Sequence, residues 1–357
     1  MLKLKPALKD YLWGGTKLRT DFGFQSDKDI IAEGWMLSCH KDGESIVENG
    51  EYKGKTLSEV IELYGKDVLG KDCEKFDFFP ILIKLIDAKK DLSVQVHPDN
   101  EYAMRVEGEY GKTECWYILD CDEGAELIYG FNREISSEEF KNRIENNTFL
   151  EVVNKVKVHK GDMFFIEAGT LHAIGSGILL AEIQQNSNTT YRVYDYQRKD
   201  KDGNLRPLHI DKAVDVTKCE KPKYDIKPVG EKEKTDCGTK QLLTKCDLFT
   251  VEEYIIDGTQ RLFASDKSFI SLLVTDGCGT IESSGEKLEA HKGDSFFVFA
   301  GSGDMMNAMI ELAATYGIAD RCHFPGFQRG KQVYECYKNS DVFVMPFRPG
   351  KNYTHIP

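Results

Sequence analysis

The sequence contains no long apolar run. Across its 357 residues, no hydrophobic stretch approaches the roughly 20 residues that a membrane-spanning helix needs. The opening residues, MLKLKPALKDYLWGG, also lack the apolar core that defines a secretory signal. We therefore expect a cytoplasmic protein with no membrane partner.

Paired cysteines and basic stretches are missing as well. The ten cysteines are scattered and form no C-x-x-C pair, which indicates reduced thiols rather than a disulfide framework. The net charge of −12 and the absence of an extended basic stripe argue against a nucleic-acid partner. An anionic substrate would therefore need a local cluster of cations. The sequence does not determine the oligomeric state.

Short segments rich in β-branched and aromatic residues are abundant. They are typical of strands and lie at 79–88, 92–98, 115–120, 125–131, 162–169 and 177–185. Helical patterns interrupt them at 57–70 and 136–153, the second opening with a Ser-Ser-Glu-Glu capping signal. The charged segment 217–240 has the composition of a linker. The pattern predicts a mainly β fold with helical insertions.

One internal repeat divides the chain. VHKGDMFFIEAGT (158–170) and AHKGDSFFVFAGS (290–302) share a turn, an aromatic strand and a second Gly turn. Two copies of one β unit predict two related β-sandwich domains, a first domain at 1–216 and a truncated second domain at 241–300. Only the first copy continues to a histidine, His172, so we expect metal binding in the first domain alone.

Four side chains form a candidate metal site. Gln95 and His97 are two residues apart on a predicted strand and so share one face. Glu114 shares a face with Lys112 by the same alternation, and His172 follows a Gly turn. A lone histidine on such a strand is usually a core residue, but the combination of two imidazoles, a carboxylate and an amide suits Zn²⁺.

Several segments together resemble a known family, the type I mannose-6-phosphate isomerases in their short bacterial form. The resemblance runs over about residues 1–300 and rests on FPILIKLIDAKKDLSVQVHPDNEYA (79–103), GKTECWYIL (111–119), EAGTLHAIGSGILLAEIQQNSNTTYRVYDY (167–196) and LHIDKA (208–213). It implies a double cupin fold and a zinc enzyme, with one ion per chain, that interconverts mannose 6-phosphate and fructose 6-phosphate.

The resemblance also assigns residues to roles. It makes Gln95, His97, Glu114 and His172 the metal ligands, and it places Arg192, Lys84, Lys112 and Glu182 in the catalytic pocket. Asn188 stands where many longer members have Asp, so a proton-transfer role of that Asp does not carry over.

The expected reaction moves a proton between neighbouring carbons through an enediol. Such a reaction needs an electrophile for the oxyanion and a base for the proton. Zn²⁺ meets the first need, and the arginine and lysines meet the phosphate charge. Glu182, Lys112 and a metal-bound hydroxide all remain open as the base.

The tail, 301–357, has a different pattern. It predicts helices at 308–316 and 333–341 and a strand at 342–346, which do not continue a jelly roll. It resembles a fragment of the retaining, two-Rossmann-lobe glycosyltransferases and lacks their downstream acidic motif. We interpret it as a fused segment without glycosyltransferase activity, which leaves the second jelly roll without its closing strands.

Two other functions use the same scaffold. A metal-dependent dioxygenase would prefer two histidines and one carboxylate around iron, so Gln95 and the Arg192 region argue against it. A sugar-binding cupin without catalysis would bind its ligand and show no turnover.

Overall fold

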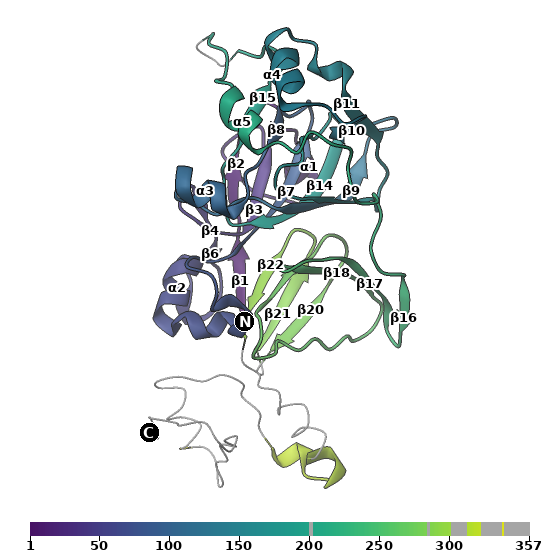
Figure 1. The fold of residues 1–357 in the computed structure, drawn as a ribbon. Helices are drawn as coiled ribbons and strands as arrows, with labels where there is room; N and C mark the ends of the chain where they lie inside the picture. The colour runs from purple at the N-terminus through teal and green to yellow at the C-terminus, as the bar shows by residue number, and fades with distance from the viewer. Residues whose placement is uncertain (200–202, 284–285, 301–312, 323–337, 339–357) are drawn as a thin grey trace.

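The computed structural model describes residues 1–199, 203–283, 286–300, 313–322 and 338. Two β-rich bodies lie one above the other in Figure 1, with the catalytic candidates in the upper one. The predicted mainly β fold is confirmed, because most elements in the described part of the chain are strands.

A six-stranded antiparallel sheet forms one wall of the upper body. Its order is β12 (Met163–Ile166), β9 (Glu114–Cys121), β14 (Ile178–Gln185), β7 (Ile81–Ala88), β3 (Glu33–Leu37) and β2 (Ala7–Lys9). Side chains alternate between its faces. On β14, Leu180 belongs to the cluster between the two sheets, whereas Leu179 and Ala181 belong to the cluster on the outer side.

A five-stranded sheet faces it. Its order is β11 (Val153–Lys157), β10 (Glu126–Phe131), β13 (His172–Ala173), β8 (Val94–Val96) and β15 (Tyr191–Tyr194). Trp116, Phe164 and Tyr129 pack in the core between the two sheets. This buried layer holds both walls of the candidate site in place.

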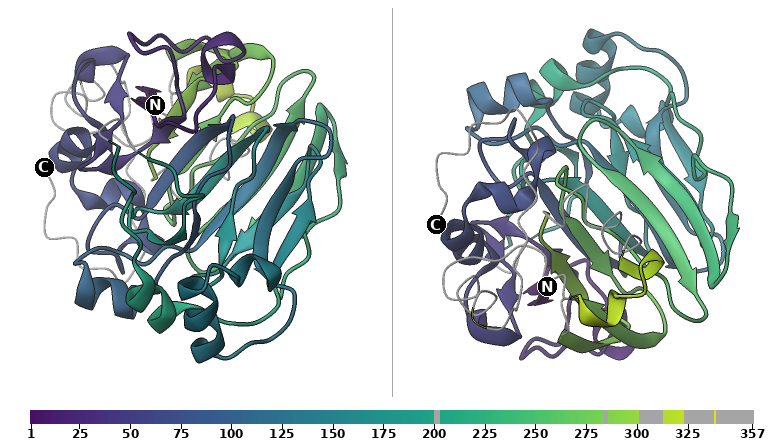
Figure 2. Two further views of the ribbon diagram at one scale, coloured as in Figure 1. Left: turned by 90° about the horizontal axis from the view of Figure 1, so that it is seen from above. Right: turned by 90° about the horizontal axis from the view of Figure 1, so that it is seen from below.

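The lower body is closed by the first strand of the chain. The third sheet has the order β19 (Ile270–Leu273), β22 (Ser295–Val298), β1 (Leu2–Lys5) and β6 (Ile46–Val47). Leu2 lies opposite Phe297, and Leu4 opposite Ser295. Figure 2 shows this N-terminal strand beside the yellow-green strands from both directions. The predicted domain boundaries at 216 and 241 stay a prediction.

The remaining strands form smaller sheets. They are β16 (Glu233–Thr235), β17 (Gly238–Lys245) and β18 (Thr250–Ile256); β20 (Cys278–Ser283) with β21 (Glu286–His291); and β4 (Cys39–His40) with β5 (Gly43–Glu44). Much of the predicted linker 217–240 has no regular structure, although β16 and the start of β17 fall within it.

The internal repeat folds into the same turn twice. The backbone N–H of His159 donates to Asp162 Oδ2 at 2.8 Å, and that of His291 donates to Asp294 Oδ2 at the same 2.8 Å. Each turn then enters an aromatic strand, β12 or β22. The repeated sequence therefore encodes a repeated local structure.

Helices cover the ends and outer faces of the sheets. They are α1 (Lys17–Thr20), α2 (Leu57–Tyr64), α3 (Asn100–Val106), α4 (Ser137–Glu145) and α5 (Ile210–Val216), with short 3-10 helices η1 (Gly50–Tyr52), η2 (Lys66–Leu69), η3 (Lys71–Cys73), η4 (Phe149–Glu151) and η5 (Ala319–Arg321). Ser136 caps α4 by accepting from the Glu139 N–H, as its sequence predicted. Both predicted helices end early, and after α4 the chain turns at Asn147 with φ of 55°.

Most of the tail lies outside the described residues, including the predicted strand at 342–346 and the predicted helix at 333–341 except for residue 338. No helix in the described ranges is long and apolar enough to cross a membrane.

Leu4→Ala tests whether β1 stabilises the lower body. Leu4 is 2 % exposed, and removing such a buried side chain costs about 2–5 kcal/mol in a core that cannot collapse. We expect a loss of that size in chemical denaturation, with little change in the exposed Lys5→Ala control on the same strand. Equal stability of the two variants would contradict the packing role of β1.

Candidate metal centre

Three adjacent strands of the five-stranded sheet place three candidate residues in one row. Gln95 on β8 pairs with His172 on β13 on one side and with Arg192 on β15 on the other. Their side chains therefore share one face of the sheet. His97 follows at the end of β8, where Pro98 favours an extended conformation at the preceding residue.

Backbone carbonyls fix both imidazole rings. His97 Nδ1 lies 2.8 Å from the Thr189 carbonyl, and His172 Nδ1 lies 2.8 Å from the Thr170 carbonyl. A carbonyl oxygen only accepts, so each Nδ1 must carry the proton. In the neutral rings, each Nε2 then carries a lone pair, and the two Nε2 atoms face one another at 3.1 Å.

Burial keeps these rings neutral. It lowers the pKa of His172 to about 4, because the charged imidazolium loses its hydration. Burial also lowers the pKa of His97 well below its usual value, with the nearby ammonium of Lys112 adding to the effect. Both histidines are therefore lone-pair donors near neutral pH.

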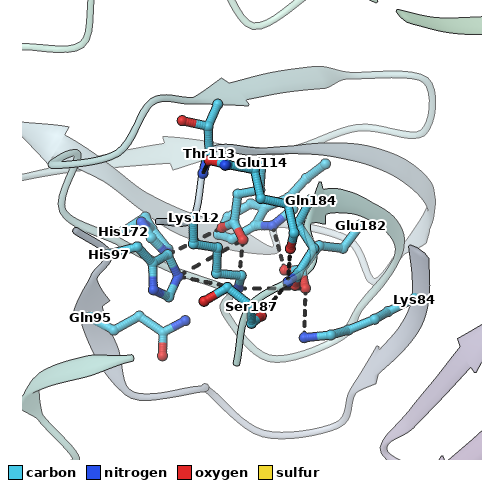
Figure 3. A network of polar contacts seen from close by, with 12 residues as sticks. Lys84, Gln95, His97, Lys112, Thr113, Glu114, His172, Glu182, Gln184 and Ser187 are labelled. Atoms are coloured by element: carbon cyan, nitrogen blue, oxygen red, sulfur yellow. Dashed lines mark hydrogen bonds and ion pairs between the residues drawn. The ribbon is translucent and has the colours of Figure 1, made fainter. Parts of the chain in front are cut away.

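Glu114 reaches the same point from the opposite sheet. Its Oε1 lies 3.3 Å from His172 Nε2, and its Oε2 lies 3.9 Å from His97 Nε2. Among the described residues, the fully buried Oε1 has no hydrogen-bond partner. Figure 3 shows the three side chains converging on one another.

A cation explains this geometry. Candidate ligand atoms of His97, Glu114 and His172 all lie within 4.8 Å of one another. Two ligands about 2.05 Å from a tetrahedral Zn²⁺ would lie about 3.3 Å apart, close to the shortest separations found here. Lone pairs that face one another without a proton repel, and a divalent ion turns that repulsion into attraction. The residues present therefore fit a metal.

Gln95 lies beside this cluster. Its Oε1 accepts from the Ser93 hydroxyl at 3.5 Å. In Figure 3 it lies on the His97 side of the network, without a dashed contact to the other three ligands. Its role as a fourth ligand stays a prediction.

The pocket candidates Lys84, Lys112 and Glu182 form one buried ion-pair network. Glu182 Oε2 lies 2.9 Å from Lys84 Nζ and 3.7 Å from Lys112 Nζ, and Lys112 Nζ lies 2.7 Å from Glu114 Oε2. Lys112 Nζ is also 3.3 Å from His97 Nε2. The network therefore links three of the predicted pocket residues to the metal cluster.

Burial and the nearby lysines shift the pKa values of the two carboxyl groups in opposite directions. Burial alone would raise the pKa of Glu182, but Lys112 and Lys84 together lower it to about 2. For Glu114, burial dominates over the opposing charge of Lys112 and raises the pKa to about 7. Burial would lower the pKa of Lys84, but Glu182 and Glu33 raise it above its usual value.

Arg192 lies at the end of the row, apart from the ion-pair network. Its Nε donates to Ser93 Oγ at 3.2 Å and its Nη1 to the Pro207 carbonyl at 3.1 Å. Burial lowers the pKa of its guanidinium, and the nearby Arg206 adds to this. Ser93 thus contacts both Arg192 and Gln95.

The sequence analysis missed several supporting residues. Trp116 Nε1 donates to Glu182 Oε1 at 3.0 Å, and its position two residues after Glu114 on β9 was the available signal. Glu33 lies 3.8 Å from Lys84 and accepts from Trp35 Nε1. The carbonyls of Thr170 and Thr189 carry no sequence signal, because every residue has one.

Comparison with known proteins identifies the family. "Phosphomannose isomerase type I, catalytic domain" matches residues 1–126, and "Mannose-6-phosphate isomerase, cupin domain" matches 239–314. "Glycosyl transferases group 1" matches 283–349, in agreement with the predicted character of the tail.

Individual relatives extend over most of the chain. It is 42% identical over 304 residues to mannose-6-phosphate isomerase ManA of Bacillus subtilis, covering 85% of this chain and 94% of ManA. It is 39% identical to the mannose-6-phosphate isomerase of Streptococcus mutans, covering 82% of this chain and 90% of that protein.

A solved structure agrees. The crystal structure of the Bacillus subtilis mannose 6-phosphate isomerase matches with a TM-score of 0.77 and 39% identity, covering 84% of this chain and 93% of that one. The expected double cupin architecture and the sequence resemblance are thereby confirmed. The chain belongs to the type I phosphomannose isomerase family.

Proposed function

We propose that this chain interconverts mannose 6-phosphate and fructose 6-phosphate with one Zn²⁺ held by His97, Glu114 and His172, and with Gln95 as a fourth ligand. The observation that carries the proposal is the convergence of two imidazole Nε2 lone pairs, 3.1 Å apart with no proton between them, beside a buried oxygen of Glu114. Imidazole and carboxylate donors favour Zn²⁺ over Mg²⁺, which prefers oxygen ligands.

When bound, Zn²⁺ would supply Lewis-acid polarisation of the sugar carbonyl. The protein must then stabilise the negative charge of the enediol intermediate. Lys84 and Lys112 present two buried ammonium groups, 2.9 and 3.7 Å from the Glu182 carboxylate that holds them. Fixed charges in a site shielded from water stabilise an oxyanion strongly.

Glu182 is better suited to anchor these lysines than to accept the proton. Its pKa of about 2 makes its carboxylate a weak base near neutral pH. Lys112 Nζ, 2.7 Å from Glu114 and 3.3 Å from His97 Nε2, can donate a proton or hydrogen bond to an oxygen bound beside the cluster.

The phosphate of the substrate needs positive charge, which Arg192 and its neighbours provide. Arg206 Nε donates to Asp195 at 2.6 Å, and Arg198 also donates to that carboxylate. Two guanidinium groups on one carboxylate leave excess positive charge beside Arg192. A planar guanidinium binds phosphate oxygens well.

Metal removal tests the function directly. We expect chelator-treated protein to lose activity in a coupled fructose 6-phosphate assay, and Zn²⁺ to restore it better than Mg²⁺ because of the imidazole donors. Ligand binding without turnover in the zinc-loaded protein would favour a non-enzymatic cupin. An iron and oxygen requirement would favour a dioxygenase, and no transfer from nucleotide sugars is expected.

Two substitutions separate metal binding from substrate binding. His172→Ala should lower both the zinc content and the activity. The loss of activity should exceed the roughly 10–100-fold that is typical when a residue supporting a metal ligand is removed, because His172 is itself a ligand. Arg192→Ala should keep the zinc and lower kcat/KM about 10- to 100-fold, since a hydrogen bond to a charged group is worth about 1.5–3 kcal/mol. The exposed Arg133→Ala serves as control. Full activity in both site variants would exclude the proposed site.

Zinc binding should release a proton from Glu114. With a pKa of about 7, this carboxyl is half protonated at pH 7 and must ionise to bind a cation, whereas His172, with a pKa of about 4, is already neutral. Affinity should therefore rise with pH from about 6 to 8 and then level off. Calorimetry in buffers of different ionisation enthalpy should detect about half a proton at pH 7. If the number of protons released did not change over this pH range, Glu114 would not be the group that ionises when zinc binds.

A further inference from the structure

The segment Asn188–Thr189 holds His97 from outside the metal cluster. It belongs to the connection between β14 and β15, where the structure has no helix or strand. The Thr189 carbonyl is the group that accepts from His97 Nδ1. The position of this one carbonyl therefore decides which ring nitrogen of His97 faces the metal site.

A carboxylate that the mechanism does not use holds this segment. Glu109, between α3 and β9, accepts from the Thr189 hydroxyl at 3.4 Å through its Oε2. The nearby backbone N–H of Asn188 also helps to lower the pKa of the Glu109 carboxyl. Glu109 thus holds the segment directly through the Thr189 hydroxyl.

Two further residues fix Glu109 itself. Lys41 Nζ lies 2.7 Å from Oε1, and the buried His40 places its Nε2 3.6 Å from Oε2. The Asp42 N–H donates to His40 Nδ1 at 3.1 Å, which leaves the ring proton on the Nε2 that faces Glu109. Burial would raise the pKa of Glu109, but Lys41 and His40 lower it below its usual value, so it is ionised.

A second contact ties the segment to the same hairpin. Asn188 Nδ2 donates to Asp42 Oδ2 at 2.8 Å. The β4–β5 hairpin, the stretch before β9 and the Asn188–Thr189 segment therefore meet around one carboxylate. Because Asn188 is exposed, apolar packing does not hold it, and these polar contacts help to set the position of the segment, together with the hydrogen bond from the Thr189 N–H to Ser187 Oγ.

We propose that Glu109 is a positioning residue for the metal centre, acting on His97 through the Asn188–Thr189 segment. The inference rests on the proposed zinc site and adds a residue outside it. Without Glu109 the segment keeps its contacts to Asp42 and Ser187 but loses the hydrogen bond on the Thr189 hydroxyl. The Thr189 carbonyl is then held less firmly, and His97 gains other ring orientations and the other tautomer. Partners that orient ligating histidines are worth about 10–100-fold in metal affinity, and we expect about tenfold for this less direct one.

Zinc affinity of the chelated protein, measured by competition with a chromophoric chelator, tests the proposal. We expect Glu109→Ala to weaken zinc binding about tenfold and Glu109→Gln, which keeps an oxygen for the segment, to restore most of it. Thr189→Val should weaken binding less, and the double variant Glu109→Ala/Thr189→Val no more than Glu109→Ala alone, because both act through one contact. The exposed Glu101→Ala is the matched control.

The melting temperature of the metal-free protein separates positioning from general stability. It should stay close to wild type in Glu109→Ala. Wild-type affinity in Glu109→Ala would overturn the proposal, as would a lowered melting temperature with no recovery in Glu109→Gln. Failure of the wild type itself to bind zinc would overturn the proposed metal centre instead, so the two failures are distinguishable.

Discussion

Two imidazole lone pairs face one another beside a buried carboxyl oxygen in this protein, with no proton between the two rings, and the surrounding structure holds them there. His97, His172 and Glu114 come from two facing sheets, so the rigidity of the sandwich sets their separation. Backbone carbonyl groups fix the tautomer of each ring by accepting a hydrogen bond from its Nδ1, and burial keeps both rings uncharged. Because of these features, the two rings cannot relieve the repulsion between their lone pairs by moving apart or by taking up a proton. A bound cation would relieve it.

The buried charges around the metal cluster do not cancel, and their sum affects the binding of an anion. Glu33, Glu114 and Glu182 are buried with Lys84 and Lys112, which leaves one excess negative charge when all five are ionised. A divalent ion reverses the sign of the pocket. Under the proposed function, the net charge of these five residues would weaken the binding of an anionic sugar phosphate, and a bound divalent ion would strengthen it, which would couple metal loading to substrate affinity.

Local pattern was enough to predict the strands and to single out His97 and Glu114, because residues two apart on a strand share a face, and His172, because it follows a Gly turn. The same rule found Gln95, but it could not reveal that its amide contacts Ser93. Backbone carbonyls and Glu109 escaped prediction, because their roles depend on which distant segments meet. The pairing of β1 with β22 escaped for the same reason, since no local signal links the two ends of a chain.

That pairing also constrains how the protein is made. Lys3 and Asp294 form an ion pair across 291 residues, so the first strand to leave the ribosome waits for one of the last. At about 5–20 residues per second, the wait is about 15–60 s. Throughout that time Leu2 and Leu4 have no neighbouring strand on the β22 side, so these two apolar side chains lack part of their final packing in the growing chain. The lower body can close only when synthesis of the second repeat is complete.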